Sequence, residues 1–203
     1  MSDRDDNIYG RATRPPVVIL AGGAARRMGG ADKGERLLAG RRLIDHVVDR
    51  LDPQMEQAVI SGRHDYGLGF SVIEDRADGP RGPAAGLWAG AHWVSEKMPN
   101  AAGFFTVPVD GPFLPQDLVS RLGESGDCAI AVDDNGVHPT FAYWRLTPLV
   151  EALAQYNTGD GVALHHIAKN CHAKRVLFPS GGSLMNINTS DDLKHAETLA
   201  RSV

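Results

Sequence analysis

The chain has 203 residues, of which 42% are hydrophobic and 23% are charged, so it is long enough for one α/β domain and its composition excludes wholesale disorder. Its formal net charge of −4 argues against a protein that coats nucleic acid, but it allows an anionic ligand, which needs only a few local cations and backbone amides. The cysteines, Cys128 and Cys171, lie far apart without CxxC spacing, which argues against a disulfide scaffold or a cysteine-rich zinc site.

Residues 1–14 are expected to form a flexible polar leader, because they carry several aspartates and no apolar run of the kind found in signal peptides. No later apolar run approaches the ~20 residues that a membrane helix needs. We therefore expect a cytoplasmic protein without a membrane or nucleic-acid partner. Residues 15–203 are predicted to form a single domain.

Apolar runs and spacings in the first half of this domain predict strands that alternate with helices. A loop rich in glycine and arginine, Ala21–Gly34, follows the first strand, and a segment rich in Gly and Pro occupies Asp75–Pro83. The predicted elements are, in chain order, a strand over Val17–Leu20, a helix over Arg42–Leu51, strands over Ala58–Ser61 and Phe70–Glu74, a helix over Ala84–Lys97 and a strand over Gly103–Val109.

The second half continues the alternation and adds a hairpin. The sequence Asp133-Asp134-Asn135-Gly136 lies between apolar runs, where Asn-Gly indicates a β-hairpin. Thr189 and Asp192 fit the capping box of a final helix. The predicted elements are a helix over Pro115–Leu122, strands over Ala129–Val132 and Val137–Trp144, helices over Thr147–Tyr156 and Gly161–Lys169, a strand over Lys174–Phe178 and a helix after Thr189.

This order of elements predicts an α/β fold of three layers, with a doubly wound, mostly parallel sheet between two layers of helices. The strand Gly103–Val109 is nearly all apolar, which favours a parallel sheet covered on both faces. We expect a small β-hairpin excursion around Asp133–Tyr143.

The strongest chemical signal is the loop LAGGAARRMGGADK, which runs from Leu20 to Lys33. Its glycines let the backbone approach a ligand without a Cβ clash. Successive N–H groups can then face phosphate oxygens, while Arg26, Arg27 and Lys33 supply positive charge. The P-loop pattern GxxxxGK[ST] and the dinucleotide fingerprint GxGxxG are absent. The loop is therefore predicted to bind phosphate in another way, and the alternative is a flexible Gly-rich turn with surface arginines.

Asp110 is the second chemical candidate, because it follows an apolar strand and open α/β sheets bind ligands at the carboxyl ends of their strands. Mg²⁺ prefers one or two carboxylates together with phosphate oxygens and waters, so a single well-placed Asp can suffice. The alternative is that Asp110 caps the turn before Pro112, since Asp-Gly is ordinary turn chemistry.

The loop from Leu20 to Lys33 resembles the signature LAGGxxxRMGGxDK of the molybdopterin nucleotidyltransferase family, in the form typical of molybdenum cofactor guanylyltransferases. Relatives that activate sugars or transfer cytidylyl groups share only a looser skeleton of Gly, Arg, Gly and Lys. Further blocks that are similar to the family, in the family's order, are Glu74-Asp75, Gly82–Gly86, Val107–Pro115, His138-Pro139-Thr140 and Asn186–Thr189.

The resemblance implies a nucleotidyltransferase Rossmann-like fold and a Mg²⁺-dependent enzyme that transfers GMP from GTP to molybdenum-bearing molybdopterin, with release of pyrophosphate. It implies catalytic roles for Arg27, Lys33 and Asp110, with Mg²⁺ on Asp110. It also implies molybdopterin contacts at Asn186 and Asn188. The nucleotide contacts that it implies are Leu20, Ala21, Gly22, Gly23, Lys33, Asp75 and Asp110. Protein partners that fit this role are molybdenum-insertion proteins and chaperones of molybdoenzymes.

Some of these assignments have a competing interpretation. The Asp75 carboxylate could accept hydrogen bonds from the N1–H and N2–H₂ of guanine, or it could pair with Arg76 or Arg81 as an ordinary loop residue. Asn186 and Asn188 lie two positions apart, so their amides would share one face of an extended segment and could contact a pterin. They could equally brace the turn before the last helix.

The chain departs from the family after the second strand. The family often has an Asn there that contacts the nucleotide, whereas this chain has Ser61-Gly62-Arg63-His64, so a backbone group could make the contact or it could be missing. Two other functions also fit the residues. One is a cytidylyl- or sugar-1-phosphate nucleotidyltransferase, and the other is a non-catalytic nucleotide-binding partner in cofactor delivery.

Overall fold

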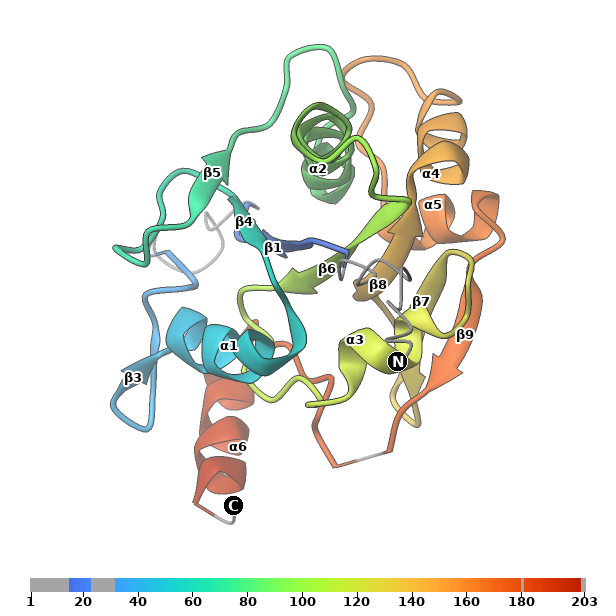
Figure 1. The fold of residues 1–203 in the computed structure, drawn as a ribbon. Coiled ribbons are helices and arrows are strands. Elements are labelled where there is room, and N and C mark those ends of the chain that lie inside the picture. The colour runs from blue at the N-terminus through green and yellow to red at the C-terminus, as the bar shows by residue number, and fades with distance from the viewer. Residues whose placement is uncertain (1–14, 23–31, 180, 202–203) are drawn as a thin grey trace, which may run out of the picture.

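The computed structural model describes residues 15–22, 32–179 and 181–201, which are organised around a seven-stranded sheet (Figure 1). The strand order is β5-β4-β1-β6-β8-β7-β9. Within this sheet β8 alone is antiparallel to its neighbours, so the sheet is mostly parallel, as predicted. The strands are β1 (Val17–Leu20), β4 (Ala58–Ser61), β5 (Ser71–Ile73), β6 (Gly103–Pro108), β7 (Ala129–Asp133), β8 (Gly136–Arg145) and β9 (Lys174–Leu177).

Helices cover both faces of the sheet, which confirms the predicted three layers. In Figure 1, α2, α4 and α5 lie above the sheet, α1 and α3 lie below it, and α6 lies beside α1. None of the helices in the described ranges is long and apolar enough to cross a membrane. The helices are α1 (Leu43–Leu51), the short 3₁₀ helix η2 (Asp52–Gln54), α2 (Pro83–Lys97), α3 (Leu118–Gly123), α4 (Leu146–Leu153), α5 (Leu164–Asn170) and α6 (Ser190–Ala200).

The sequences of β1 and α2 explain how closely these layers pack. Val18 of β1 faces the layer that holds α2, whereas Val17 and Ile19 face the layer that holds α1, and all three are fully buried. The buried face of α2 consists mainly of Ala and Gly. A Cβ on Gly90 would lie 3.1 Å from both Phe104 and Val18. Small side chains therefore let α2 lie close over β1 and β6.

The order of the strands places a ligand-binding edge beside β1. Strand β1 pairs in parallel with β4 on one side and with β6 on the other, with Leu20 opposite Pro108. Helix α1 follows β1 on one face, and α2 precedes β6 on the opposite face. This is a topological switch point, where open α/β sheets bind ligands at the carboxyl ends of the strands. The Gly-rich loop and Asp110 both follow strands that end there.

Two helices begin three residues later than predicted. The helix expected from Pro115 begins at Leu118, because the Pro115 carbonyl accepts the Leu118 N–H at 3.2 Å and closes a turn first. The helix expected from Gly161 begins at Leu164, because Gly161 forms an isolated β-bridge with Arg81. In both places these local backbone hydrogen bonds form instead of the first helical turn that the apolar spacing predicts.

The helix ends give one correction and one confirmation. Helix α4 ends at Leu153 and not at Tyr156, whose N–H bonds the Leu153 carbonyl in a turn at 3.1 Å. The capping box of α6 is formed as predicted, with the Thr189 hydroxyl accepting the Asp192 N–H and the Asp192 carboxylate accepting the Thr189 N–H.

The hairpins differ in place from the prediction. Strands β7 and β8 do pair through the turn before Gly136, but both belong to the main sheet. The separate hairpin is formed by β2 (Leu37–Leu38) and β3 (Arg41–Arg42), which the sequence analysis missed. Its turn residues Ala39 and Gly40 have φ angles of 49° and 81°. Two residues with positive φ are typical of the tight turns that match the twist of a hairpin.

Candidate active site

Lys33, Asp110 and Asn188 meet at the carboxyl edge of the sheet. Lys33 lies in the connection from β1 to β2, Asp110 lies just after β6, and Asn188 lies just before α6. The Lys33 Nζ donates to Asp110 Oδ2 at 2.7 Å and to Asn188 Oδ1 at 2.7 Å. The structure thus joins a residue predicted to bind nucleotide, the predicted metal ligand and a residue predicted to bind the acceptor.

The ion pair has a buried side and an open side. The Asp110 side chain is 7% exposed, whereas the Lys33 side chain is 36% exposed. The backbone of Asp110 is fixed as well, because its carbonyl accepts the Ile187 N–H at 2.8 Å. A ligand that arrives from solvent therefore meets the ammonium group of Lys33 against a rigid carboxylate.

A polar cluster around Asp32 holds the backbone next to Lys33. One Asp32 oxygen accepts the Gly34 N–H at 2.8 Å and the Tyr66 hydroxyl at 2.7 Å, and the other lies 3.2 Å from His64 Nε2. A Cβ on Gly34 would lie 2.6 Å from the Tyr66 ring, so the ring packs where only glycine leaves room. This contact fixes the β4–β5 connection against the loop that carries Lys33.

The same cluster shifts the proton affinity of Tyr66. Burial, assisted by the hydrogen bond to Asp32, raises the pKa of the Tyr66 hydroxyl well above its usual range, so it remains a hydrogen-bond donor. Asp32 stands within the loop motif, but the motif predicted no role for it, and the contact of Tyr66 was not predicted. The turn sequence Asp65-Tyr66-Gly67 was the only signal, and it indicates a turn rather than a contact with Asp32.

The start of the Gly-rich loop is tied to β4. The N–H groups of Ala21 and Gly22 both donate to the Ser61 carbonyl at 2.8 Å, and the Leu20 carbonyl accepts the Val109 N–H at 3.1 Å. These two amides are therefore engaged within the protein, and a nucleotide contact at Ala21 or Gly22 falls to their carbonyl groups and Cα surfaces. The Ser61 carbonyl, near the place where the family often has an Asn, therefore bonds the loop, and a nucleotide contact at this place stays a prediction.

Three residues that the sequence analysis singled out in the loop lie outside the described residues. They are Gly23, Arg26 and Arg27, so the nucleotide contact expected at Gly23 and the catalytic role expected for Arg27 stay predictions.

Asp75 faces the same loop from the end of β5. A Cβ on Gly22 would lie 4.0 Å from Asp75 Oδ1. Loss of hydration, followed by the charge of Glu74, raises the pKa of Asp75 above its ordinary value. Arg76 pairs with Asp78 at 2.9 Å instead of with Asp75. No residue in the described ranges forms an ion pair with the Asp75 carboxylate, which leaves its oxygens available to a ligand.

The first turn of α2 completes this edge of the sheet. A Cβ on Gly86 would lie 2.8 Å from Leu20 Cδ2 and 3.0 Å from Ser61 Oγ, so the turn packs against the carboxyl ends of β1 and β4. The N-terminus of a helix carries a partial positive charge that favours anions. The block Gly82–Gly86 therefore presents a helix N-terminus, which suits an anionic group, at the carboxyl edge of the sheet.

Asn186 and Asn188 have different surroundings. Asn188 Oδ1 accepts Lys33, whereas Asn186 Oδ1 is buried without a hydrogen-bond partner in the described part of the chain. A buried polar atom normally has a hydrogen-bond partner, so a donor group of a ligand would suit the Asn186 oxygen. Within the described residues, the turn before α6 is held by Asp192 Oδ2, which accepts the backbone N–H groups of Asn188 and Thr189 at 2.9 and 2.7 Å, and not by the side chains of the two asparagines.

His138 has a structural contact. Its Nε2 lies 2.7 Å from Asp133 Oδ1, within the turn between β7 and β8. Burial opposes the charge of Asp133, but hydrogen bonds from His138 and from the Asn135 N–H outweigh this effect and lower the pKa of Asp133. The pair stabilises the turn and involves neither Lys33 nor Asp110.

Within the described residues, the side chains could supply some of the ligands of a metal ion but not a full set. Among the described residues, no group of three or more His, Cys, Asp or Glu side chains could hold a metal ion. Asp110, which is predicted to bind Mg²⁺, offers one carboxylate, and a hard cation can take its remaining ligands from phosphate and water.

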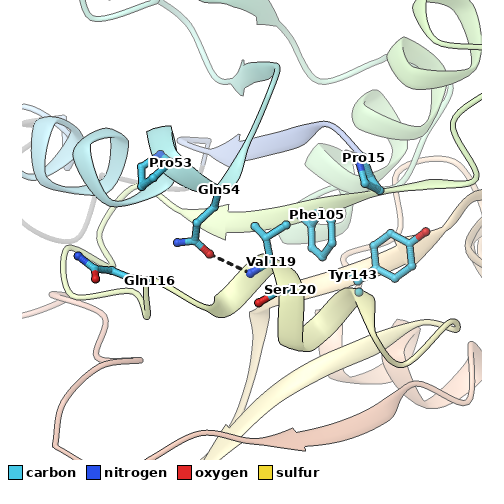
Figure 2. Close-up of a pocket in the computed structure, with 9 residues that line it drawn as sticks. Pro15, Pro53, Gln54, Phe105, Gln116, Val119, Ser120 and Tyr143 are labelled. Atoms are coloured by element: carbon cyan, nitrogen blue, oxygen red, sulfur yellow. Dashed lines mark hydrogen bonds between the residues drawn. The ribbon is translucent and has the colours of Figure 1, made fainter. Parts of the chain in front are cut away.

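A cavity of about 430 Å³ lies at the opposite edge of the sheet, and Figure 2 shows its lining. Pro15, just before β1, forms one wall, and Phe105 and Tyr143 form another. The Gln54 side chain accepts the Val119 N–H there at 3.0 Å. None of the lining residues belongs to the predicted site, so the polar edge around Lys33 and Asp110 remains the candidate active site.

Comparison with known sequences covers most of the chain. The model of the MobA-like NTP transferase domain matches residues 17–173. A molybdenum cofactor guanylyltransferase from Cereibacter sphaeroides is 38% identical over 190 residues, which cover 91% of this chain and 96% of that protein. A molybdenum cofactor guanylyltransferase from a Bradyrhizobium species is 36% identical, with 93% of this chain and 94% of that protein covered.

Solved structures share the fold. The molybdopterin-guanine dinucleotide biosynthesis protein A from Archaeoglobus fulgidus is similar with a TM-score of 0.66 and 24% identity, covering 93% of this chain and 100% of the other. The 2-C-methyl-D-erythritol 4-phosphate cytidylyltransferase from Thermus thermophilus is similar with a TM-score of 0.61 and 18% identity, covering 91% and 98%. At these identities the similarity concerns the fold alone, and it does not separate one nucleotide from another.

Proposed function

Because this chain belongs to the MobA-like NTP transferase family, we propose that it transfers GMP from GTP to molybdenum-bearing molybdopterin and releases pyrophosphate. The observation that carries the proposal is the contact of Lys33 with Asp110 at the switch point of the sheet, where the loop motif and the strand-end carboxylate meet. An ammonium group beside a fixed carboxylate suits a triphosphate with a bound cation.

The reaction places few acid–base demands on the protein. An oxygen of the acceptor phosphate forms a bond to the α-phosphorus of GTP, and the bond from that phosphorus to the bridging oxygen breaks, so that pyrophosphate leaves with the electron pair. The attacking phosphate is already an anion and needs no general base. The protein must instead hold two anionic substrates in line and offset their charge.

Lys33 and Asp110 are assigned to this task. Lys33 offers its ammonium group to the phosphates of GTP from the exposed side of the ion pair. Asp110 is the residue that would hold Mg²⁺, which when bound neutralises charge on the triphosphate. Arg27 is assigned to the α-phosphate and the leaving pyrophosphate on the strength of the loop motif.

The two substrates are assigned to opposite sides of this pair. Asp75 faces Gly22 without an ion-pair partner in the described residues, which supports its role as the acceptor for the N1–H and N2–H₂ of guanine. Asn186, with its unpartnered buried oxygen, is assigned to the pterin. Asn188 lies between the two sides because it touches Lys33.

The test is pyrophosphate release by the purified protein with GTP, Mg²⁺ and molybdopterin. Release with GTP but not with CTP or ATP supports the proposal, and release with CTP or with a sugar 1-phosphate as acceptor would favour the related transferases. Thermal shifts with each nucleotide give an independent measure, since selective binding stabilises the folded state by mass action. Binding of GTP without any turnover would favour a non-catalytic partner in cofactor delivery.

A second measurement addresses the metal. Titration with Mn²⁺ followed by water proton relaxation should give binding in the presence of GTP that Asp110→Ala weakens. Turnover in the presence of a chelator, at the rate seen with added Mg²⁺, would contradict the metal dependence.

A further inference from the structure

Asn188 belongs to a motif that is predicted to bind the acceptor, molybdopterin. Its side chain, however, contacts Lys33, which is predicted to bind the nucleotide. The Lys33 ammonium has three N–H donors, and two of them are fixed at 2.7 Å by Asp110 Oδ2 and Asn188 Oδ1. A lysine side chain is a flexible stem with a compact charge, so one acceptor fixes it poorly. Two acceptors from different elements fix the position of the ammonium and direct the third N–H.

Asn188 can act as a fixed acceptor because the chain around it is anchored. The Ile187 N–H donates to the Asp110 carbonyl at 2.8 Å, and the Ile187 side chain is fully buried with Leu38 and Leu43. The Asn188 N–H donates to Asp192 Oδ2 at 2.9 Å. The backbone of Asn188 is thus bonded through its neighbour to Asp110 and through its own amide to the first turn of α6.

We propose that Asn188 is a positioning residue for nucleotide binding, which acts by holding the Lys33 ammonium beside Asp110. This inference rests on the proposed function, because it takes Lys33 to contact GTP. It separates Asn188 from Asn186, whose buried oxygen meets no donor in the described part of the chain. The asparagines of one short motif therefore serve different substrates, and Asn188 connects the acceptor side with the triphosphate.

The experiment is a GTP titration in Mg²⁺ without acceptor, so that no pterin contact contributes. Asn188→Ala should weaken GTP binding about tenfold, as expected when a hydrogen bond to a charged group is lost. Asn170→Ala is the matched control, because it removes the same amide from α5, where that amide contacts Gln155 and Tyr156 and not Lys33, and its GTP dissociation constant should stay within about twofold of wild type. Thermal melts of both variants check that they are folded.

A double-mutant cycle then tests whether the effect passes through Lys33. In a Lys33→Ala background, Asn188→Ala should cause no further loss of GTP affinity, measured by a titration that extends into the millimolar range. An unchanged dissociation constant in Asn188→Ala, or an equal loss with and without Lys33, would overturn the inference and leave the proposed function standing. Wild-type protein that binds no GTP would overturn the proposed function itself.

Discussion

Replacement of Lys33 or Asp110 by alanine should remove most turnover and leave the protein folded. The two side chains meet at 2.7 Å at the switch point, where charge must be offset in the transition state. Loss of one preorganised charge contact of this kind typically costs a factor of about 10²–10³ in rate, which is roughly 3–4 kcal/mol. We expect each variant to lose turnover by that factor when GTP and molybdopterin are saturating.

The cost to folding should be much smaller. Breaking a fully buried ion pair costs about 3–5 kcal/mol, but an exposed pair contributes only about 0–1 kcal/mol. Since the Lys33 side chain is 36% exposed, we expect an intermediate loss of about 1–2 kcal/mol in the free energy of unfolding. At this chain length such a loss lowers Tm by only about 2–8 °C.

The assay is pyrophosphate release at 25 °C, combined with thermal melts of each variant. Arg41→Ala is the matched control, because it breaks an ion pair of the same length, 2.7 Å to Asp49. Both side chains of this pair are more than half exposed, and neither bonds Lys33 or Asp110. It should leave both rate and Tm near those of wild type. A rate within about threefold of wild type in folded Lys33→Ala or Asp110→Ala protein would refute the assignment of that residue, because it would show that the removed charge does not act on the reacting phosphates.

Three further changes test other parts of the site. Asp75→Asn should reduce the preference for GTP over ATP about tenfold in kcat/KM, because an amide offers one acceptor oxygen where guanine presents two donors; an unchanged preference would remove the base-contact hypothesis. Gly34→Ala should lower the free energy of unfolding, measured in urea, by about 1–3 kcal/mol, because the new Cβ would lie 2.6 Å from the Tyr66 ring. In the control Gly161→Ala the new Cβ meets no atom within 4 Å, so this variant should unfold like wild type. Equal unfolding midpoints for the two variants would contradict the packing of Tyr66 on Gly34. Burial alone would raise the pKa of Asp192, but the backbone N–H donors at the start of α6 outweigh burial and lower this pKa. The Asp192 carboxylate therefore stabilises the fold above the ordinary Asp pKa of about 3.9, and this contribution is lost as the pH falls through the lower pKa of the native state. Asp192→Ala should therefore be about 1 kcal/mol less stable than wild type near about pH 7, and this difference should shrink as the pH falls below about 3.9. A difference that is independent of pH would contradict this origin.

The strands of the switch point could be predicted because their sequences are continuous apolar runs, as expected for strands buried on both faces. Val17–Leu20 and Ala58–Ser61 are short apolar runs, and both are strands with the predicted bounds. The β2–β3 hairpin could not be predicted in the same way. Strands of two residues have no measurable alternation, and Ala39 gives no sign of the positive φ that it adopts.

The composition of the site was predicted better than its connections. The loop motif and the strand-end position identified Lys33 and Asp110, and the structure brings them together. The bond from Lys33 to Asn188 spans 155 positions in sequence, and nothing in either segment indicates it. The role of Tyr66 was also hidden, because its hydroxyl reaches Asp32 only after the β4–β5 connection turns back over the loop.

The hydrogen bond from the Ile187 amide to the Asp110 carbonyl has a consequence for when the site is completed during synthesis of the chain. Synthesis starts at the N-terminus, so Lys33 and Asp110 leave the ribosome long before Asn188. The nascent chain then contains both charged partners while the contact with Asn188 is still missing. The Lys33 ammonium therefore gains its contact with Asn188 only after the segment before α6 has been synthesised and has bonded the Asp110 carbonyl.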